Sequence, residues 1–357
     1  MKPKLIILQT VLPDYRKAFF NVLRKELQQR LMVYGGATYF DSSIVTDQDI
    51  SFQKVENNFF LGRRFLWQKG VRKLAKSNAV LIIELNPWIL SNWFLLLSRK
   101  RKKLTTILWG HAWSRKGRES KTEFLRHRMR TLATAIITYT EDQKRELQLK
   151  MPDMDIVAAP NALVSASDMK AVTARPEHLV YVGRLTASKK PLFLIKAFEQ
   201  SLDVIPDTAV LKIIGDGPEM KALKRYVKNH NLDKRVKILG RISKTENLKE
   251  IYANTLVSLC AGEVGLFLTQ SLGFGVPMIV SKDENHGPEF SAALVGENIL
   301  VFKTDDTASF RNAIKELYKN KDSWIAKRPT IAKNCANNFS VEAMAQTFIN
   351  LVATYET

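Results

Sequence analysis

Short apolar runs alternate with segments of helical period along the whole chain of 357 residues. The apolar runs lie at 4–9, 31–34, 79–84, 104–109, 134–140 and 155–160 in the first half, and at 179–183, 209–215, 235–240, 256–260, 277–281 and 298–302 in the second. Strands that alternate with helices of about 10–15 residues indicate βαβ units and parallel sheets. The sequence therefore predicts an α/β fold with two Rossmann-like domains, whose parallel sheets face a central cleft. Because ligands of such sheets bind beyond the carboxyl ends of the strands, we expect the site in that cleft.

The segment at 165–178, SASDMKAVTARPEH, is typical of a linker between the two series, since it is polar, contains one proline and lacks apolar periodicity. Helices are expected between the strands, including one near 65–76. Another, at 246–253, follows the pattern Ser243-Lys-Thr-Glu246, which is a capping box.

Positive charge is concentrated in the first half of the chain. The net formal charge is +20, and residues 1–150 carry 29 Lys and Arg against 12 Asp and Glu, whereas residues 151–357 carry 26 against 23. Apolar and aromatic residues lie between or beside basic blocks at 63–64, 69–76, 99–103, 115–118 and 121–130. The pattern favours an anionic partner, either a phospholipid surface, a phosphorylated acceptor or nucleic acid. A solvated basic face with the aromatic residues in the core is the simpler alternative.

Cysteine and histidine patterns point to neither a metal site nor a disulfide framework. Cys260 and Cys335 lack CxxC spacing, and the five histidines form neither HxxxH nor HExxH. The most apolar window, 79–97, is interrupted by polar residues and a proline, so it fits a strand and a helix better than a membrane span of about 20 apolar residues. The N-terminal segment lacks the features of a signal peptide. We therefore expect a cytoplasmic protein with no metal and no transmembrane helix.

Arg184 and Lys189 follow the first strand of the second series. Arg184 lies at the carboxyl end of strand 179–183 and Lys189 at the start of the next helix, so both can reach one anionic group there. A diphosphate is the expected guest, because an arginine can bind two of its oxygens. Solvated charge at a helix start is the alternative.

Two glycine-rich loops follow later strands. Gly215 and Gly217, in GDGP, allow close approach of the backbone. Glu263 and the pair Gly265-Leu266 follow strand 256–260, with Gln270 one helical turn beyond Leu266 on the same face. Each loop by itself can be an ordinary turn, but the order and spacing of the three motifs are more specific.

Together these runs resemble the donor domain of family 4 glycosyltransferases, which have the GT-B fold. The resembling segments are GRLTASKKPLFLIKAF, LKIIGDGPEMKALK, VKILGRISKTENLKEIYANT and GEVGLFLTQSLGFGVPMIV. The resemblance is dense over 178–335 and fainter in the first half, through Pro160-Asn161 and LWGHAW. It implies an acceptor-binding domain at 1–165, a nucleotide-sugar donor domain at 178–335 and a C-terminal helix at 336–357 that packs back on the first domain. The GEVGL form is similar to that of bacterial capsule, O-antigen and lipopolysaccharide transferases.

The resemblance also implies roles for the motif residues. Arg184 and Lys189 would bind the nucleotide diphosphate. Gly215 and Gly217 would lie against the nucleotide, and the backbone at Gly265-Leu266 would meet the diphosphate or the sugar.

The chain departs from the family at two acidic positions. Members usually carry two glutamates with seven residues between them, the first on the donor sugar and the second on the ribose. Here the second position is Gln270, whose amide can still bond a ribose diol. The first position is occupied by a glycine, with Glu263 one place later. The carboxylate that meets the sugar is therefore Glu263 or, with His286, Glu289 of the HGPEF segment.

Candidates in the first half follow strands as well. Asp14, Tyr15 and Arg16 come after strand 4–9 and are expected at the mouth of the cleft, although Asp14 can equally cap a helix and Tyr15 pack. His111 follows strand 104–109, and in similar transferases a histidine near this place contacts the donor sugar or the acceptor. Its imidazole can accept or orient a hydroxyl proton at neutral pH, but a lone histidine can also be structural.

The resemblance implies a retaining enzyme that moves a hexose from a UDP- or GDP-sugar to a hydroxyl of a glycan acceptor. Donor-site cations would stabilise the leaving diphosphate, so neither a cofactor nor a metal is expected. A lipid-linked acceptor and a peripheral position on the inner face of the cytoplasmic membrane would account for the basic first half. One alternative is a nucleic-acid-binding protein, although no recognition motif is present. The other is a sugar-nucleotide epimerase of GT-B type, which would need no acceptor domain.

Overall fold

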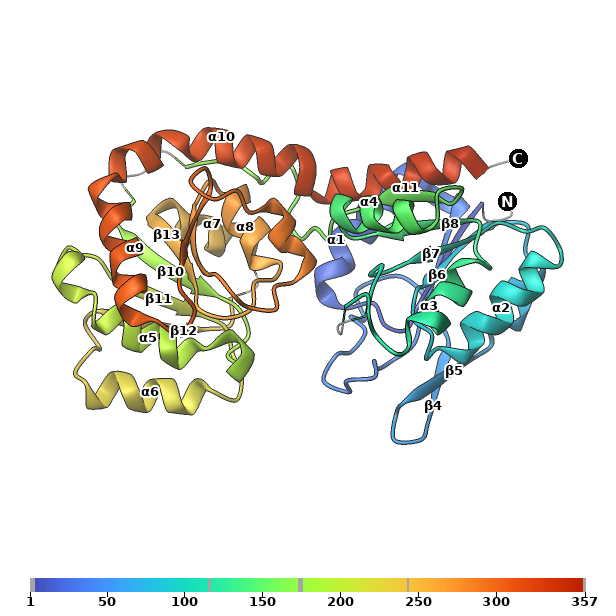
Figure 1. Ribbon diagram of the computed structural model, residues 1–357, viewed down its shortest axis with the longest axis horizontal. Helices are drawn as coiled ribbons and strands as arrows, with labels where there is room; N and C mark the ends of the chain where they lie inside the picture. Colours follow the sequence, from blue (N-terminus) through green and yellow to red (C-terminus); the bar gives the residue numbers. More distant parts are fainter. Residues whose placement is uncertain (1–3, 115–116, 173–175, 243, 356–357) are drawn as a thin grey trace. The chain divides into compact units, whose positions relative to one another are not determined.

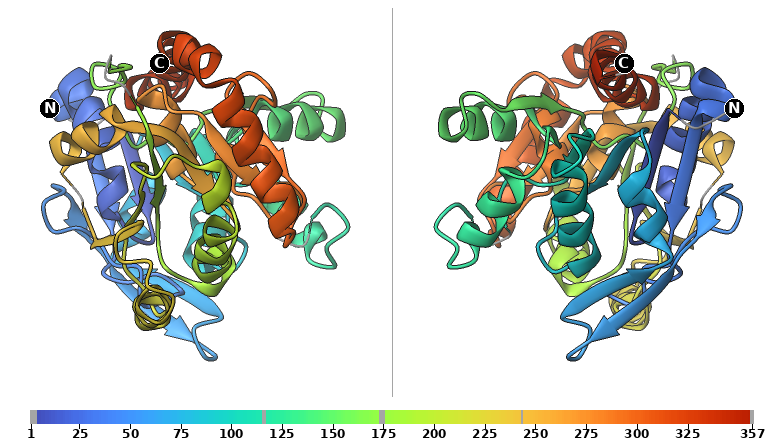
Figure 2. Two further views of the ribbon diagram at one scale, coloured as in Figure 1. Left: turned by 90° about the vertical axis from the view of Figure 1, so that its left-hand side faces the viewer. Right: turned by 90° about the vertical axis from the view of Figure 1, so that its right-hand side faces the viewer.

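The computed structural model describes residues 4–114, 117–172, 176–242 and 244–355 (Figure 1). The chain divides into two compact units. Unit 1 comprises Met1–Leu163 and Val341–Thr357, and unit 2 comprises Val164–Ser340. Each unit contains one large parallel sheet with helices packed against it (Figures 1 and 2).

The sheet of unit 1 has the strand order β3-β2-β1-β6-β7-β8-β9, and all neighbouring strands are parallel. Its strands are β1 (Leu5–Gln9), β2 (Leu31–Gly35), β3 (Gln53–Lys54), β6 (Val80–Glu84), β7 (Thr106–Trp109), β8 (Ala135–Thr138) and β9 (Asp155–Ala158). Side chains of β1 alternate between two hydrophobic clusters, with Leu5 and Ile7 in one and Ile6 and Leu8 in the other. This alternation follows from the period of two in a strand and shows that both faces of the sheet are covered.

Different helices cover the two faces of this sheet. The cluster on one face includes residues of α1 (Lys17–Leu27) and α11 (Val341–Tyr355), and the cluster on the other includes residues of α2 (Leu90–Lys100), α3 (Glu123–Arg130) and α4 (Glu141–Lys150). The C-terminal helix α11 packs directly on α1, where the rings of Phe19 and Phe348 are 4.9 Å apart. The last helix of the chain is thus part of unit 1.

The segment expected as a helix near 65–76 begins instead with a strand. β4 (Glu56–Phe60) and β5 (Phe65–Lys69) form an antiparallel hairpin, and a 3-10 helix, η3, follows at Val71–Lys76. The helix prediction was wrong for β5 because its residues, FLWQK, alternate in burial with a period of two, and aromatic residues favour strands.

The sheet of unit 2 has the order β12-β11-β10-β13-β14-β15, which is the doubly wound order of a Rossmann-like domain. Its strands are β10 (His178–Val182), β11 (Leu211–Ile214), β12 (Val236–Gly240), β13 (Thr255–Cys260), β14 (Met278–Ser281) and β15 (Ile299–Phe302). Its helices are α5 (Pro191–Glu199), α6 (Met220–Asn229), α7 (Thr245–Ala253), α8 (Phe267–Gly273), α9 (Thr307–Lys319) and α10 (Lys321–Phe339). The expected α/β class with two Rossmann-like domains is confirmed. Ser243 of the capping box lies outside the described residues, and α7 begins at Thr245.

Two arginines of the basic blocks are core residues rather than surface charges. Arg99 is fully buried, and its guanidinium donates to four backbone carbonyl oxygens at 2.7 Å and to Thr106 Oγ1 at 2.9 Å. Arg130 is also fully buried, where it pairs with Glu123. Burial lowers the pKa of Arg99 to about 10. No helix within the described ranges is long and apolar enough to cross a bilayer.

Candidate functional site

Glycines bring the backbone of neighbouring strand ends together at the carboxyl edge of unit 2. Gly183 follows β10 and donates its N–H to Ile214 O at 2.9 Å, and Gly215 donates to Gly240 O at 2.8 Å. A Cβ on Gly215 would lie closer than 3.0 Å to the carbonyl oxygen of Gly183, and Gly215 has φ 145°. Gly217, with φ 155°, is equally close to the backbone after β10. Only glycine therefore fits at 215 and 217, and the loops after β10 and β11 form one surface of packed backbone.

The two predicted cations lie beside this surface. Arg184 is exposed, and the hydroxyl of Tyr181 donates to its carbonyl oxygen at 2.9 Å. Lys189 is half-buried, and its Nζ donates to Glu263 O at 2.5 Å. Burial lowers the pKa of Lys189, and the positive charge of Arg184 lowers it further, although the nearby carboxylates of Glu263 and Glu289 act in the opposite direction. An anion bound next to Arg184 and Lys189 would relieve this repulsion and compensate for the lost hydration.

The loop after β13 is attached to the loop after β10. Glu263 donates its backbone N–H to Ser188 O at 3.1 Å, and a Cβ on Gly262 would be closer than 3.0 Å to the same oxygen. A Cβ on Gly265 would lie 3.8 Å from Lys189 Nζ. β10 and β13 are the adjacent strands at which the strand order of the sheet reverses, which is where doubly wound sheets bind their ligands.

His286 holds this loop from its other side. Its Nδ1 accepts a hydrogen bond from the Val264 N–H at 3.1 Å, and its Nε2 donates to Ser281 O at 3.0 Å. The ring also stacks on Phe290, with 4.1 Å between ring centroids. Because one nitrogen accepts and the other donates, the ring is neutral, and its burial lowers the pKa of His286. Both ring nitrogens are used within unit 2, so His286 positions the loop at 262–265.

The remaining predicted residues of unit 2 lie around the same loop. Glu289 is 7% exposed and its charge raises the pKa of Lys189, so its carboxylate lies on the Lys189 side of the loop. Gln270, also 7% exposed, lies within α8, and its Oε1 accepts a hydrogen bond from Tyr252 at 3.4 Å. The structure therefore brings Arg184, Lys189, Glu263, Gly265 and Glu289 together, whereas Gln270 is set one turn further along the helix.

Lys190 is a part of this edge that the sequence analysis missed. Its Nζ forms ion pairs with Glu284 at 2.7 Å and with Asp305 at 2.8 Å. These two carboxylates follow β14 and β15, so Lys190 connects the loops of three strands. The partners are distant in sequence, and no local pattern in the chain could have indicated them.

Arg16 of unit 1 is an internal residue. It is 8% exposed, its guanidinium lies 4.3 Å from the ring centroid of Trp109, and one of its nitrogens donates to Asn161 Oδ1 at 2.9 Å. Asp14 accepts a hydrogen bond from the backbone N–H of Tyr15 at 2.8 Å, and Tyr15 is 37% exposed. Arg16 therefore supports the carboxyl edge of the unit 1 sheet, while Tyr15 is the member of this trio with the more accessible side chain.

Three further titratable groups lie at that edge of unit 1. The ring of His111, which is exposed, packs against Tyr139 with 4.7 Å between centroids, and its Nδ1 is 3.5 Å from Gln143 Nε2. Glu84, which the sequence analysis did not select, ends β6 and accepts a hydrogen bond from the backbone N–H of Thr10. Burial raises the pKa of Glu84 and raises that of Tyr139 to about 12, so both groups favour their protonated forms more than usual.

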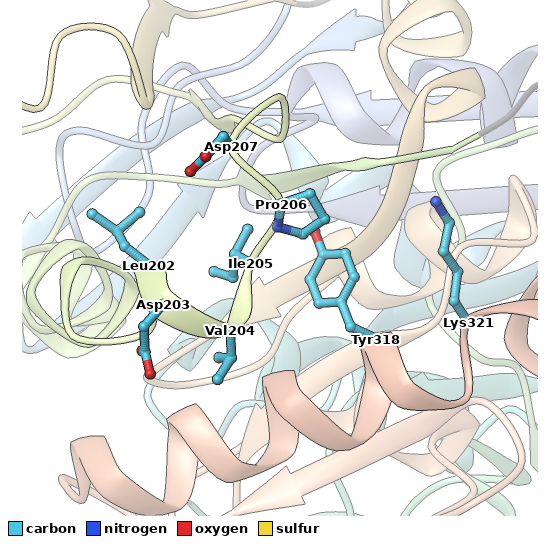
Figure 3. A pocket seen from close by; sticks show the side chains of 8 residues that line it. All are labelled: Leu202, Asp203, Val204, Ile205, Pro206, Asp207, Tyr318 and Lys321. Carbon is cyan, nitrogen blue, oxygen red and sulfur yellow. The ribbon is translucent and has the colours of Figure 1, made fainter.

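A hollow of about 600 Å³ lies elsewhere on unit 2 (Figure 3). It is lined by residues 202–207, which precede β11, and by Tyr318 and Lys321 at the junction of α9 and α10. These residues are at the amino end of β11, whereas the glycine loops and the two cations follow the carboxyl ends of the strands. The hollow is therefore separate from the predicted donor site.

Comparison with curated proteins identifies a family for unit 2. Residues 168–337 match the model of the family described as glycosyl transferases group 1. A phosphatidylinositol N-acetylglucosaminyltransferase of Arabidopsis thaliana is 23% identical over 232 residues, which are 58% of this chain and 51% of that protein. N-acetyl-alpha-D-glucosaminyl L-malate synthase of Bacillus anthracis is 30% identical over 107 residues, 29% of this chain and 27% of that protein. The chain thus spans about half or less of the length of these relatives.

Solved structures resemble the whole chain. Anabaena Alr3699/HepE in complex with UDP has a TM-score of 0.74 at 14% identity and covers 98% of this chain and 100% of its own. The lipopolysaccharide outer core galactosyltransferase WaaB has a TM-score of 0.65 at 16% identity, with 99% of both chains covered. At such low identity these likenesses establish the fold alone. Through the domain at residues 168–337, the chain belongs to the group 1 glycosyltransferases of family 4, with the GT-B fold.

Proposed function

We propose that the protein is a retaining glycosyltransferase that moves a hexose from a nucleoside-diphosphate sugar to a hydroxyl of a glycan acceptor. The observation that carries the proposal is the pair Arg184 and Lys189 beside the glycine surface, at the strand reversal of a group 1 domain. UDP is the nucleotide favoured by the comparisons, because similar structures contain UDP, UDP-glucose, or UDP with GlcNAc. GDP is the alternative.

The chemistry proposed for the two cations is stabilisation of the leaving group. As the bond between the sugar and the diphosphate breaks, negative charge develops on the diphosphate oxygens. Lys189 is fixed by its bond to Glu263 O and half-desolvated, so its charge acts through a weakly screening environment. Removing one preorganised donor from such a site typically lowers kcat by about 10²–10³-fold. Glu263 or Glu289 would contact the donor sugar.

Unit 1 is proposed to bind the acceptor. His111 is exposed at the carboxyl edge of its sheet, where an imidazole can accept or orient the proton of an acceptor hydroxyl. A lipid-linked glycan of bacterial surface polysaccharide synthesis would explain why residues 1–150 carry 29 Lys and Arg against 12 Asp and Glu. On this proposal the protein works at the surface of an anionic membrane.

The proposal is tested by incubating the purified protein with UDP- and GDP-hexoses and candidate glycan acceptors, and by following nucleotide release and the anomeric configuration of the product by NMR. We expect a product with the configuration of the donor. Lys189→Ala should lower kcat by about 10²-fold or more, whereas Lys196→Ala, an exposed lysine on α5, should leave it unchanged. An inverted product would contradict the retaining mechanism. Conversion of the donor without any acceptor would point to the epimerase instead.

A further inference from the structure

The β4–β5 hairpin of unit 1 carries exposed apolar side chains at its tip. Phe60, the last residue of β4, is 49% exposed, and Leu61, the first residue of the turn, is 77% exposed. The hairpin extends away from the sheet of unit 1, as the views in Figures 1 and 2 agree. Turns are usually made of Gly, Pro, Asn, Asp and Ser, so two large apolar residues at a projecting tip require an explanation.

The turn has a defined conformation that presents Leu61 outward. Leu61, Gly62 and Arg63 all have positive φ, at 48°, 61° and 64°. This region is disfavoured for leucine and arginine, so neighbouring contacts must hold it. Arg63 does so: its guanidinium donates from Nε to Phe40 O at 3.1 Å and lies 3.8 Å from the ring centroid of Phe59. The leucine is thus fixed at the tip by the structure around it.

A band of aromatic residues and one exposed arginine lies behind the tip. The backbone N–H of Leu66 in β5 donates to Trp88 O at 2.9 Å, which joins the hairpin to the segment before α2. The rings of Phe65 and Trp88 are 5.6 Å apart, and the guanidinium of Arg64 lies 5.5 Å from the Trp88 ring. An apolar tip followed by tryptophan and arginine is the arrangement that suits the boundary between acyl chains and lipid headgroups.

The charge around the hairpin selects the partner. Residues 54–83 carry seven Lys and Arg and a single acidic residue, Glu56. Such a surface is attracted to anionic lipid headgroups, and each basic residue near them adds to the attraction. A second copy of this chain would bring the same positive charge to the contact and be repelled. Nucleic acid would satisfy the charge but offers no apolar phase for Phe60 and Leu61.

We propose that the β4–β5 hairpin is a membrane-insertion element, in which Phe60 and Leu61 enter the acyl boundary of an anionic bilayer while Arg64 and Trp88 lie at the headgroups. The inference deepens the proposed function and rests on it only for the lipid-linked acceptor. Insertion would hold unit 1 at the surface on which such an acceptor is embedded.

The first experiment measures binding of the full chain to vesicles of phosphatidylcholine, with and without phosphatidylglycerol, by co-sedimentation. We expect binding that requires the anionic lipid and that is at least about ten-fold weaker for the double substitution Phe60→Ser/Leu61→Ser. The matched control is Leu294→Ser/Val295→Ser, which alters two consecutive apolar residues of unit 2 that are 47% and 66% exposed. It should bind vesicles like the unmodified protein. Equal losses in both variants would overturn the proposal.

A second experiment locates the tip directly. Both native cysteines, Cys260 and Cys335, are buried, so a Leu61→Cys variant of the folded protein can be labelled selectively with an environment-sensitive fluorophore. On anionic vesicles we expect a blue shift and quenching by lipids that carry a quencher on the acyl chain. The same label on Val295→Cys should show neither. A label at position 61 that stays in water while the protein sediments with the vesicles would overturn the insertion.

The remaining outcomes separate this inference from the proposed function. Failure of the unmodified protein to bind any vesicle, together with normal binding of UDP, would overturn the hairpin proposal and leave the donor site intact. If Phe60→Ser/Leu61→Ser changes the molar mass in light scattering but not vesicle binding, the tip contacts a second copy of the chain, and the proposal is wrong. Binding of nucleic acid that depends on Phe60 and Leu61 would also contradict it.

Discussion

Replacing Gly215 with alanine should destabilise unit 2 and disrupt the donor edge together. The added Cβ would lie closer than 3.0 Å to the backbone oxygen of Gly183, and backbone yields less readily than the end of a flexible side chain. Overpacking of this kind typically costs about 1–3 kcal/mol. The positive φ of 145° adds about 1–3 kcal/mol for any residue with a Cβ. We therefore expect the free energy of unfolding to fall by roughly 3 kcal/mol or more.

Two other glycines separate these contributions. Gly240→Ala changes a residue with φ 72° and no heavy atom within 4 Å of the added Cβ, so it should cost only the conformational part, about 1 kcal/mol. Gly262→Ala places a Cβ too close to Ser188 O without a positive φ, so it reports the steric part alone.

The assay is differential scanning calorimetry of the three variants, with urea unfolding as a second measure. For a domain of this size, about 3 kcal/mol corresponds to a decrease of roughly 6–12 °C in Tm. Gly215→Ala should also weaken nucleotide binding, whereas Gly240→Ala should affect it less. A Gly215→Ala protein as stable as Gly240→Ala would refute the claim that the two loops meet through backbone contact.

Three further predictions concern the loop support, acid stability and the buried arginine. His286→Ala removes the ring that fixes the loop at 262–265, so it should cost about 1–3 kcal/mol in urea unfolding and weaken nucleotide binding in calorimetry; unchanged affinity would contradict its positioning role. Burial lowers the pKa of His127, His178 and His286, so the unfolded chain binds protons first and stability should fall as pH drops below about 6.5; equal unfolding free energies at about pH 7.5 and about pH 5.5 would contradict this sign. Arg99→Leu leaves four carbonyl oxygens without this donor, so it should cost at least about 3 kcal/mol in thermal or urea unfolding; a variant of normal stability would show that the buried guanidinium is dispensable.

Much of the fold could be predicted from the sequence because its signals are local. The apolar runs at 4–9 and 179–183 contain β1 and β10, and the glycines of GDGP occupy backbone positions that only glycine tolerates. The hairpin strand at 65–69 was missed, because a short aromatic run has no unambiguous period and the turn that pairs it with β4 contains only one glycine.

The contacts of the site could be predicted only in part, because they join residues that are far apart in the chain. Lys190 and Asp305 are 115 positions apart, and Thr10 and Glu84 are 74 apart. Arg99 and Arg16 were assigned to the surface or the cleft because sequence shows charge and not partners. An arginine can be buried when carbonyl oxygens or aromatic rings from other elements surround its guanidinium, and that condition depends on the tertiary structure.

The claim that unit 2 holds a nucleotide-sugar donor through two cations is tested most directly by isothermal titration of UDP, GDP, ADP and CMP. The unmodified protein is compared with Arg184→Ala/Lys189→Ala, and with Lys196→Ala as the control. We expect one diphosphate, UDP or GDP, to bind with micromolar affinity, to bind equally well to the control, and to lose about 10²-fold or more in the double variant, since hydrogen bonds to charged groups contribute about 1.5–3 kcal/mol each. If no nucleotide binds, or if the double variant binds as tightly as the unmodified protein, the donor site is not where we place it.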